Sequence, residues 1–290
     1  MRLFSRDFLL KGSLRVAFLA VVLVAMVLPQ RARAAEFANE DLNYEIVYHW
    51  GLIWKHAASA TLSLRNDGDV YRTSLTARTV SWADGVYRVR DTLSCTIAKE
   101  GLRPLHYVKS SHEGKHDEVD EVKYSYRGYT TIGQCTRRRP GKEPSVKQLE
   151  TQGTAYDMLS VFYFLRKLNF AGMRESTVYK STVFSGKKKE TVSVKLVGIE
   201  DVKLRDKSKH RAYHVQFTFT QDGATKSSDD IDTWISTDER RIPLMVRGRL
   251  SIGEIRVYFK RSEVRGKSGG GRGERGFLVV VGKCFAKLVE

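Results

Sequence analysis

Two stretches of sequence, "VYRTSLTARTV" (70–80) and "VYRVRDTLSCTIA" (86–98), decide the fold class. Both are rich in Val, Tyr, Thr and Ile, and apolar residues alternate with polar ones along them. This period of two is typical of β-strands that bury one face. The residues "ADG" (83–85) between them supply turn chemistry. The two stretches therefore predict successive strands of an antiparallel sheet.

The same pattern extends in both directions along the chain. From Leu42 to Cys135 it recurs in "LNYEIVYH", "ASATLSLR", "LHYVKSS", "DEVKYSY" and "YTTIGQC", and Asp, Asn and Gly clusters separate the runs. Further runs follow in the second half: "TVYKSTVF", "ETVSVKLVGIEDV", "AYHVQFTF", "DDIDTWIST", "PLMVRGRL" and "GEIRVYFKR". About a dozen strands fit one all-β, mainly antiparallel domain, built as a curled sheet or open barrel.

One segment breaks the strand pattern. "TAYDMLSVFYFLRKLNF" (154–170) contains no Gly or Pro, and it is apolar at 155, 158, 159, 162, 165 and 168, which is a helical spacing. Thr154 is a candidate N-cap. The other faces of this helix also carry aromatic residues, which would have to be buried against the rest of the protein. We therefore expect one long buried helix with the sheet wrapped around it.

The N-terminal segment has the features of a signal peptide. Basic residues precede a 13-residue apolar stretch (16–28), which is shorter than the roughly 20 residues of a spanning helix. "ARA" (32–34) fits a cleavage site, so we expect residues 1–34 to be removed and the protein to be periplasmic or secreted; an uncleaved anchor is the alternative. We expect 35–265 to form one β-rich envelope domain. Residues 266–290 are expected to be a glycine-rich linker and C-terminal tail.

The chain is strongly basic. The formal net charge is +17, and the first 34 residues contribute six basic side chains and one acid, so 17 − 5 leaves +12. A cationic exported protein is attracted to lipids or other anionic envelope components, and peripheral membrane contact fits the same charge. Export excludes nucleic acid as a partner. A merely solvated basic surface is the alternative.

The three cysteines do not form a disulfide framework, because their number is odd. Cys95 and Cys135 both fall in predicted strands and could pair in an oxidising compartment, which would leave Cys284 unpaired. The sequence leaves this pairing open.

The string "HEGKH" (112–116) matches the zinc motif of metalloproteases, in which both histidines bind the metal from one helix. Here it stands between two strand patterns, and Gly114 and Lys115 fit the tip of a hairpin. In a strand, His112 and His116 would be about 13 Å apart. We therefore predict a hairpin, and neither a metal site nor a cofactor. The alternative is a surface metal site, if a tight hairpin brings His112 and His116 together with Asp117 or His106.

No other motif predicts catalysis. Ser160 lacks the glycine-flanked elbow of hydrolases, and "GGGRG" (269–273) does not follow a strand that leads into a helix. Asp229, Asp230 and Asp232 stand where a strand begins, which is more typical of a turn. We predict a protein without enzymatic activity. A hydrolase whose carboxylates meet only in the fold, or a structural scaffold, are the alternatives.

The predicted strands are rich in aromatic residues that would line the interior or the rim of a curled sheet. Most of them are expected to form the core. If the helix does not fill the interior, the remainder would enclose an apolar pocket that could take an acyl chain.

Several strings together resemble an exported bacterial family of unknown function, domain of unknown function (DUF) 3108. They are "FANEDLNYEIVYHWGLIWKHAASATLSL", "VYRVRDTLSCTI", "LRPLHYVKSSHEGK", "YDMLSVFYFLRKL" and "DTWISTDERRIPLMVRGRLSIGEIRVYF". The resemblance covers about residues 37–262. It implies a β-rich envelope protein and supplies no catalytic residues.

The most specific part of the resemblance is the helix pattern that contains Asp157, Tyr163 and Arg166. Together with Trp234, these three residues are the candidate ligand contacts, and Arg166 would meet an anionic headgroup at a cavity mouth. The alternative is that Asp157 and Arg166 anchor the helix to the sheet. The pair is separated by about 13–14 Å along a helix, so the two are not expected to contact each other.

Overall fold

The computed structural model of this chain describes residues 36–174, 177–250 and 252–260. The expected signal peptide (1–34), the tail after 265 and Cys284 lie outside the described residues. The chain divides into two units, Met1–Phe37 and Ala38–Glu290, and the fold described below is that of the second unit.

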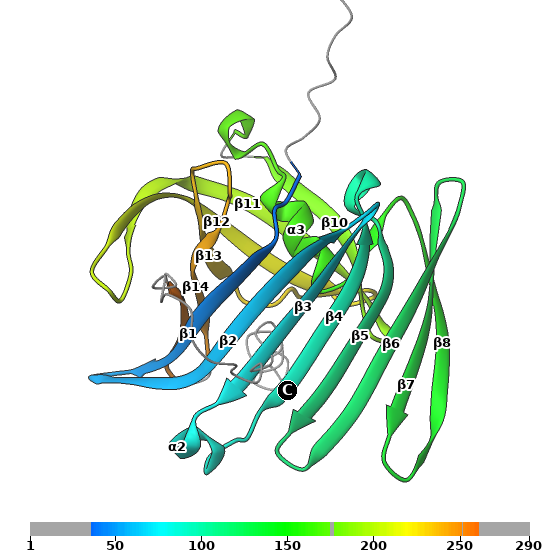
Figure 1. The fold of residues 1–290 in the computed structure, drawn as a ribbon, viewed down its shortest axis with the longest axis horizontal. Helices are drawn as coiled ribbons and strands as arrows, with labels where there is room; N and C mark the ends of the chain where they lie inside the picture. The colour runs from blue at the N-terminus through cyan, green and yellow to red at the C-terminus, as the bar shows by residue number, and fades with distance from the viewer. Residues whose placement is uncertain (1–35, 175–176, 251, 261–290) are drawn as a thin grey trace, which may run out of the picture. The chain divides into compact units, whose positions relative to one another are not determined.

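Fifteen strands form one sheet (Figure 1). They are β1 (Glu40–Trp50), β2 (Ile53–Asp67), β3 (Val70–Thr79), β4 (Arg90–Ala98), β5 (Pro104–Glu113), β6 (His116–Arg127), β7 (Thr130–Arg139), β8 (Lys142–Gln152), β9 (Ala155–Tyr156), β10 (Val178–Ser185), β11 (Lys188–Lys203), β12 (Lys209–Gln221), β13 (Ile231–Ser236), β14 (Pro243–Arg249) and β15 (Glu254–Lys260). The helical segments are α2 (Ser81–Asp84), α3 (Ser160–Arg166) and two 3₁₀ turns, η1 (Glu100–Leu102) and η2 (Phe170–Gly172).

The strand order is a meander with one long-range pairing. β1 to β8 follow one another, β9 to β15 do the same, and β1 joins the two series by pairing with β15. Every pairing is antiparallel except the short one between β9 and β10. The prediction of an all-β, mainly antiparallel sheet that curls toward a barrel is confirmed, with fifteen strands in place of about a dozen.

The sheet almost closes where its two ends approach each other. The Thr131 hydroxyl on β7 donates to the Gly153 carbonyl oxygen (2.6 Å), just before β9 begins. On β10, the ring of Phe184 stacks on Tyr124 of β6, with ring centroids 5.9 Å apart. Lys187, in the turn after β10, donates to the Ser145 hydroxyl on β8 (2.9 Å). The two ends of the strand order, β6 to β8 on one side and β9 to β10 on the other, are therefore in contact.

The sequence missed β8 for a physical reason. Nearly all of its residues are exposed, and its one buried side chain is Leu149, so the strand shows no apolar alternation. It also contains Pro144. An edge strand tolerates proline because one row of its backbone groups has no partner strand.

The prediction of one long helix over 154–170 is wrong. Ala155 and Tyr156 form β9, α3 covers only Ser160–Arg166, and η2 follows at Phe170. The helix starts late because Asp157, and not Thr154, caps it: the Asp157 carboxylate accepts from the backbone N–H groups of Leu159 (2.8 Å) and Ser160 (3.0 Å). The apolar character of the whole segment comes from its burial.

"HEGKH" forms the predicted hairpin tip, with Gly114 and Lys115 between β5 and β6 and Gly114 at φ +59°.

The open question of whether Cys95 and Cys135 form a disulfide is also answered for the described residues, in which both are buried free thiols. Cys95 lies on β4 and Cys135 on β7, three strand spacings or about 14 Å apart along the sheet, which is too far for a disulfide.

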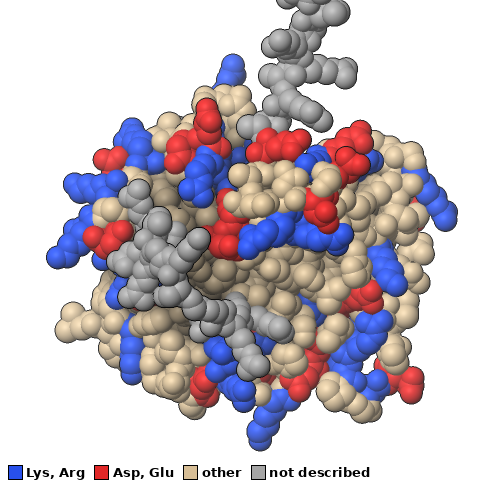
Figure 2. Space-filling view, viewed as in Figure 1, with Lys and Arg blue, Asp and Glu red and all other residues tan. Residues whose placement is uncertain are grey.

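Charged residues of both signs are dispersed over one face of the molecule. Lys and Arg side chains alternate with Asp and Glu on the face drawn in Figure 2. Among the described residues, no helix combines the length and the apolarity needed to cross a membrane.

Gly133 on β7 marks the place where the two ends of the sheet meet. A Cβ added there would lie 2.6 Å from the ring of Phe184. Because the ring is fully buried and cannot move aside, Gly133→Ala is expected to lower the free energy of unfolding by about 1–3 kcal/mol, measured by urea denaturation. Gly198→Ala on β11, where a Cβ meets nothing within 4 Å, is the matched control. Equal stability of the two variants would contradict this closure.

Candidate ligand-binding site

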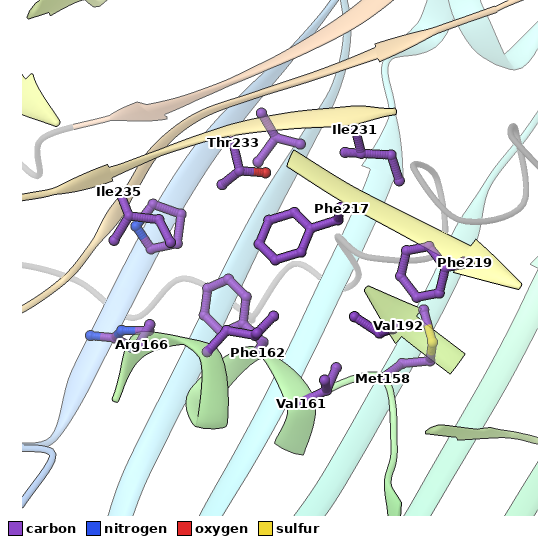
Figure 3. A pocket seen from close by; sticks show the side chains of 13 residues that line it. Met158, Val161, Phe162, Arg166, Val192, Phe217, Phe219, Ile231, Thr233 and Ile235 are labelled. Carbon is purple, nitrogen blue, oxygen red and sulfur yellow. The ribbon is translucent and has the colours of Figure 1, made fainter. Parts of the chain in front are cut away.

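An apolar cavity of about 100 Å³ lies between α3 and strands β11 to β14 (Figure 3). It is lined by Met158, Val161, Phe162, Leu165, Arg166, Val192, Phe217, Phe219, Ile231, Thr233, Ile235, Pro243 and Val246. Among these lining residues, Arg166 carries the one charge and Thr233 the one hydroxyl. Figure 3 shows side chains from the helix and from the strands converging on this space.

Side chains alternate between the two faces of each strand, and this alternation determines which residues line the cavity. Phe217 and Phe219 share one face of β12, and Ile231, Thr233 and Ile235 share one face of β13. Residues two apart point to the same side of a strand. The inner face of this half of the sheet is therefore a continuous apolar wall opposite α3.

Asp157 positions the start of α3. Its backbone N–H donates to the Ser160 hydroxyl, and the Ser160 backbone N–H donates back to the Asp157 carboxylate, a reciprocal arrangement of the capping-box type. The Cys95 thiol on β4 also donates to this carboxylate (3.0 Å). Burial raises the pKa of Asp157, and these hydrogen bonds oppose the shift. Asp157 thus holds the helix against β4 and does not line the cavity.

The other candidate residues on α3 are also held by the sheet. The Thr73 hydroxyl on β3 donates to the Tyr163 hydroxyl (3.1 Å), so Tyr163 points away from the cavity. Arg166 lines the cavity with part of its side chain, but its guanidinium pairs with the Glu40 carboxylate. It also donates to the carbonyl oxygens of Arg240 (2.7 Å) and Arg241 (3.1 Å).

Trp234 lies on the opposite face of β13 from the cavity. Its indole N–H donates to Glu200 (2.6 Å), its ring stacks on His214, and the Arg247 guanidinium lies 5.4 Å from the ring centroid. Of the four candidate ligand contacts, the structure therefore places only Arg166 at the cavity. The lining residues of β11 to β14 were not singled out from the sequence as ligand contacts, except as part of a general aromatic signal.

The Arg166–Glu40 pair is buried, with side-chain exposures of 2% and 8%, and it joins α3 to β1. Removal of one partner leaves a buried charge without its counter-ion. Arg166→Met is therefore expected to lower the free energy of unfolding by about 3–5 kcal/mol in urea denaturation. The double variant Arg166→Met with Glu40→Gln should recover part of this loss. A single variant as stable as the wild type would show that Arg166 does not anchor the helix.

A second feature is a pair of buried carboxyl groups, Asp91 on β4 and Glu113 at the end of β5. The His112 backbone N–H donates to Asp91 (2.9 Å), and the Tyr87 hydroxyl donates to Glu113 (3.2 Å). Burial, followed by the charge of Glu113, raises the pKa of Asp91 to about 7. Such a value is typical of acid–base groups, but both side chains are buried and neither lines the apolar cavity.

The raised pKa of Asp91 has a consequence for stability. The unfolded chain ionises this group near its ordinary value of 3.8, whereas the folded chain keeps the proton until about pH 7, so the stability from this group is lost as the pH rises through that range. Asp91→Asn should gain stability relative to the wild type by about 2–3 kcal/mol between about pH 5 and pH 8. Urea denaturation at both pH values measures this gain. Asp67→Asn, at an exposed position, should show no such gain in stability. An equal gain for both variants would contradict the raised pKa of Asp91.

Among the described residues, no group of three or more His, Cys, Asp or Glu side chains is placed to hold a metal ion. His112 instead pairs with Asp117 (2.8 Å). Asp229 and Asp230 lie in the segment before β13, and Asp232 pairs with Arg247 (2.6 Å) and His214 (2.8 Å).

Comparisons with known proteins bear on the fold and on the family of this chain. A solved structure, described as a beta-barrel-like protein of domain of unknown function DUF1849 from Brucella abortus, superposes with a TM-score of 0.56 at 11% sequence identity. The match covers 78% of this chain and 98% of that chain, and at this identity it supports the fold alone. No curated protein matches the chain. The sequence pattern of the family described as "Protein of unknown function (DUF3108)" matches residues 43–260. The resemblance is thus confirmed, and the chain belongs to the DUF3108 family.

Proposed function

We propose that this protein is an exported, non-enzymatic protein of the cell envelope that binds the aliphatic part of a lipid-like molecule. The observation that carries the proposal is the apolar cavity between α3 and β11 to β14. For comparison, an apolar cavity of about 150 Å³ stays dry and accepts benzene. A space of about 100 Å³ suits the end of an aliphatic chain.

The chemistry of the lining favours an apolar ligand segment over a charged one. Arg166 already has Glu40 as its counter-ion, together with two backbone carbonyl oxygens. A ligand carboxylate or phosphate inside the cavity would have to displace one of these partners. The ligand headgroup is therefore expected to remain outside, and the aliphatic chain to enter between the helix and the strands.

The two alternatives have less support. A hydrolase would need carboxyl groups that a substrate can reach, and the Asp91–Glu113 pair is buried away from the cavity. A scaffold without a ligand would need no interior space.

Export is supported by the N-terminal basic and apolar segments and by "ARA" (32–34). The same features support a periplasmic or secreted location.

Native mass spectrometry of the chain purified gently from a bacterial periplasm tests the proposal. The expected mass is that of residues 35–290 plus a fatty acid or phospholipid that organic solvent removes. A bare polypeptide mass would contradict ligand binding, and a mass that still includes residues 1–34 would contradict cleavage.

A cavity-filling variant locates the ligand. Val192→Phe on β11 places a ring in the cavity and is expected to abolish the mass excess. The overpacking should lower the free energy of unfolding by about 1–3 kcal/mol. Val246→Phe on β14 is a second filler at a half-buried position. Val197→Phe, on β11 but exposed and outside the lining, is the matched control and should keep the ligand. Folded filler variants that retain the ligand would place it elsewhere.

A further inference from the structure

The turn between β1 and β2 exposes a concentrated set of large apolar side chains. Leu52 is fully exposed, and Trp50, Ile53 and Trp54 are each about half exposed. In Figure 2 this turn projects as an uncharged tip at the left, at the place that Figure 1 gives to the end of β1 and β2. Single exposed apolar residues are common on protein surfaces, but four in five consecutive positions are not.

Two neighbouring segments extend this surface. The β14–β15 turn lies beside the β1–β2 turn, because the Tyr48 hydroxyl donates to the Ile252 carbonyl oxygen (3.1 Å), and Ile252 is exposed. On the other side, the indole N–H of Trp82 in α2 donates to the His56 carbonyl oxygen on β2 (2.7 Å). We name this surface the apolar rim and define it by Trp50, Leu52, Ile53, Trp54, Trp82 and Ile252.

Cationic side chains lie against the rim. The Lys55 ammonium group lies 4.1 Å from the ring centroid of Trp82, and the Arg256 guanidinium lies 4.7 Å from that of Trp54. Indole rings with cations beside them are typical of protein segments that rest at the headgroup level of a bilayer.

A basic hollow of about 580 Å³ lies next to α2 and is lined by Arg78, Arg88, Arg90, Thr92, Ser110 and His112. Arg90 is held by Asp84 of α2 (2.5 Å). Arg78 stands directly opposite Arg90 in the β3–β4 register, and Asp84 balances one of these two like charges. Within the described part of the chain, the side chains of Arg78 and Arg88 make no hydrogen bond or ion pair. The charge of Arg88 adds to the effects of Arg90 and Thr79 that lower the pKa of Asp84.

We propose that the apolar rim and the basic hollow together form a docking surface for an anionic lipid bilayer. The rim would enter the headgroup region, and Arg78 and Arg88 would pair with lipid phosphates, for which the planar guanidinium is well suited. A protein partner fits less well, because the cores of protein interfaces are depleted of charge, and here cations lie directly beside the apolar residues. The inference rests on the surface and is independent of the interior cavity.

Sedimentation with vesicles tests the inference on the full mature chain. The wild type is expected to bind vesicles of equal parts phosphatidylcholine and phosphatidylglycerol, with a shift of its tryptophan emission to shorter wavelength. Trp50→Ser with Leu52→Ser should weaken this binding at least tenfold. Arg78→Gln with Arg88→Gln should also weaken it about tenfold or more, because each basic side chain near an anionic surface contributes roughly fivefold.

Control variants outside the rim and the hollow test whether vesicle binding depends on this docking surface or only on the total apolarity and charge of the protein. Val146→Ser with Ile199→Ser removes two exposed apolar residues outside the rim, and Arg127→Gln removes an exposed strand arginine outside the hollow. Both controls should bind vesicles as the wild type does, and so should Val192→Phe.

Three outcomes would overturn the inference. The first is vesicle binding by the rim variant that equals that of the wild type. The second is equal binding of the wild type to phosphatidylcholine alone, which would remove the role of the anion. The third is competition in which free inorganic phosphate displaces the protein from vesicles at concentrations where sulfate does not, because this would make the hollow a site for a soluble phosphate.

Discussion

The buried carboxyl group of Asp157 is the interaction on which the interior of this protein depends. Asp157 directly follows the short strand β9, begins α3 through its exchange of hydrogen bonds with Ser160, and accepts a hydrogen bond from the Cys95 thiol on β4. A carboxyl group without solvent access is stable only if such donors surround it. The position of α3 inside the curled sheet is therefore set at its first turn, and the Arg166–Glu40 pair sets it again at its last turn.

The cavity follows from this anchoring. The polar contacts through Asp157, Tyr163 and the Arg166–Glu40 pair reach strands of the first half of the sheet, and Arg166 also donates to the Arg240 and Arg241 carbonyl oxygens just before β14. Toward β11 to β14 the helix presents apolar side chains together with part of the Arg166 side chain, and its seven residues do not fill the space in front of these strands. An apolar cavity thus remains between α3 and β11 to β14.

The sequence predicts the strands well because most of them bury one face and alternate. It fails where burial departs from that pattern. β8 is exposed on both faces, and β13 is buried on both, so the period of two could not show that Trp234 points away from the interior. The spacing of Asp157 and Ser160 is a capping signal within the apolar run, and it could have placed the helix start correctly. The pairing of Arg166 with Glu40 joins residues 126 positions apart, and no local pattern predicts it.

The central claim is that a dry, apolar cavity lies between α3 and β11 to β14. A crystal structure of residues 35–290 under xenon pressure tests it most directly, because xenon enters dry apolar cavities that water does not fill. The account predicts xenon or aliphatic ligand density beside Val161, Val192 and Phe217. Density for ordered water, or a repacked interior that leaves no space at this position, would contradict it.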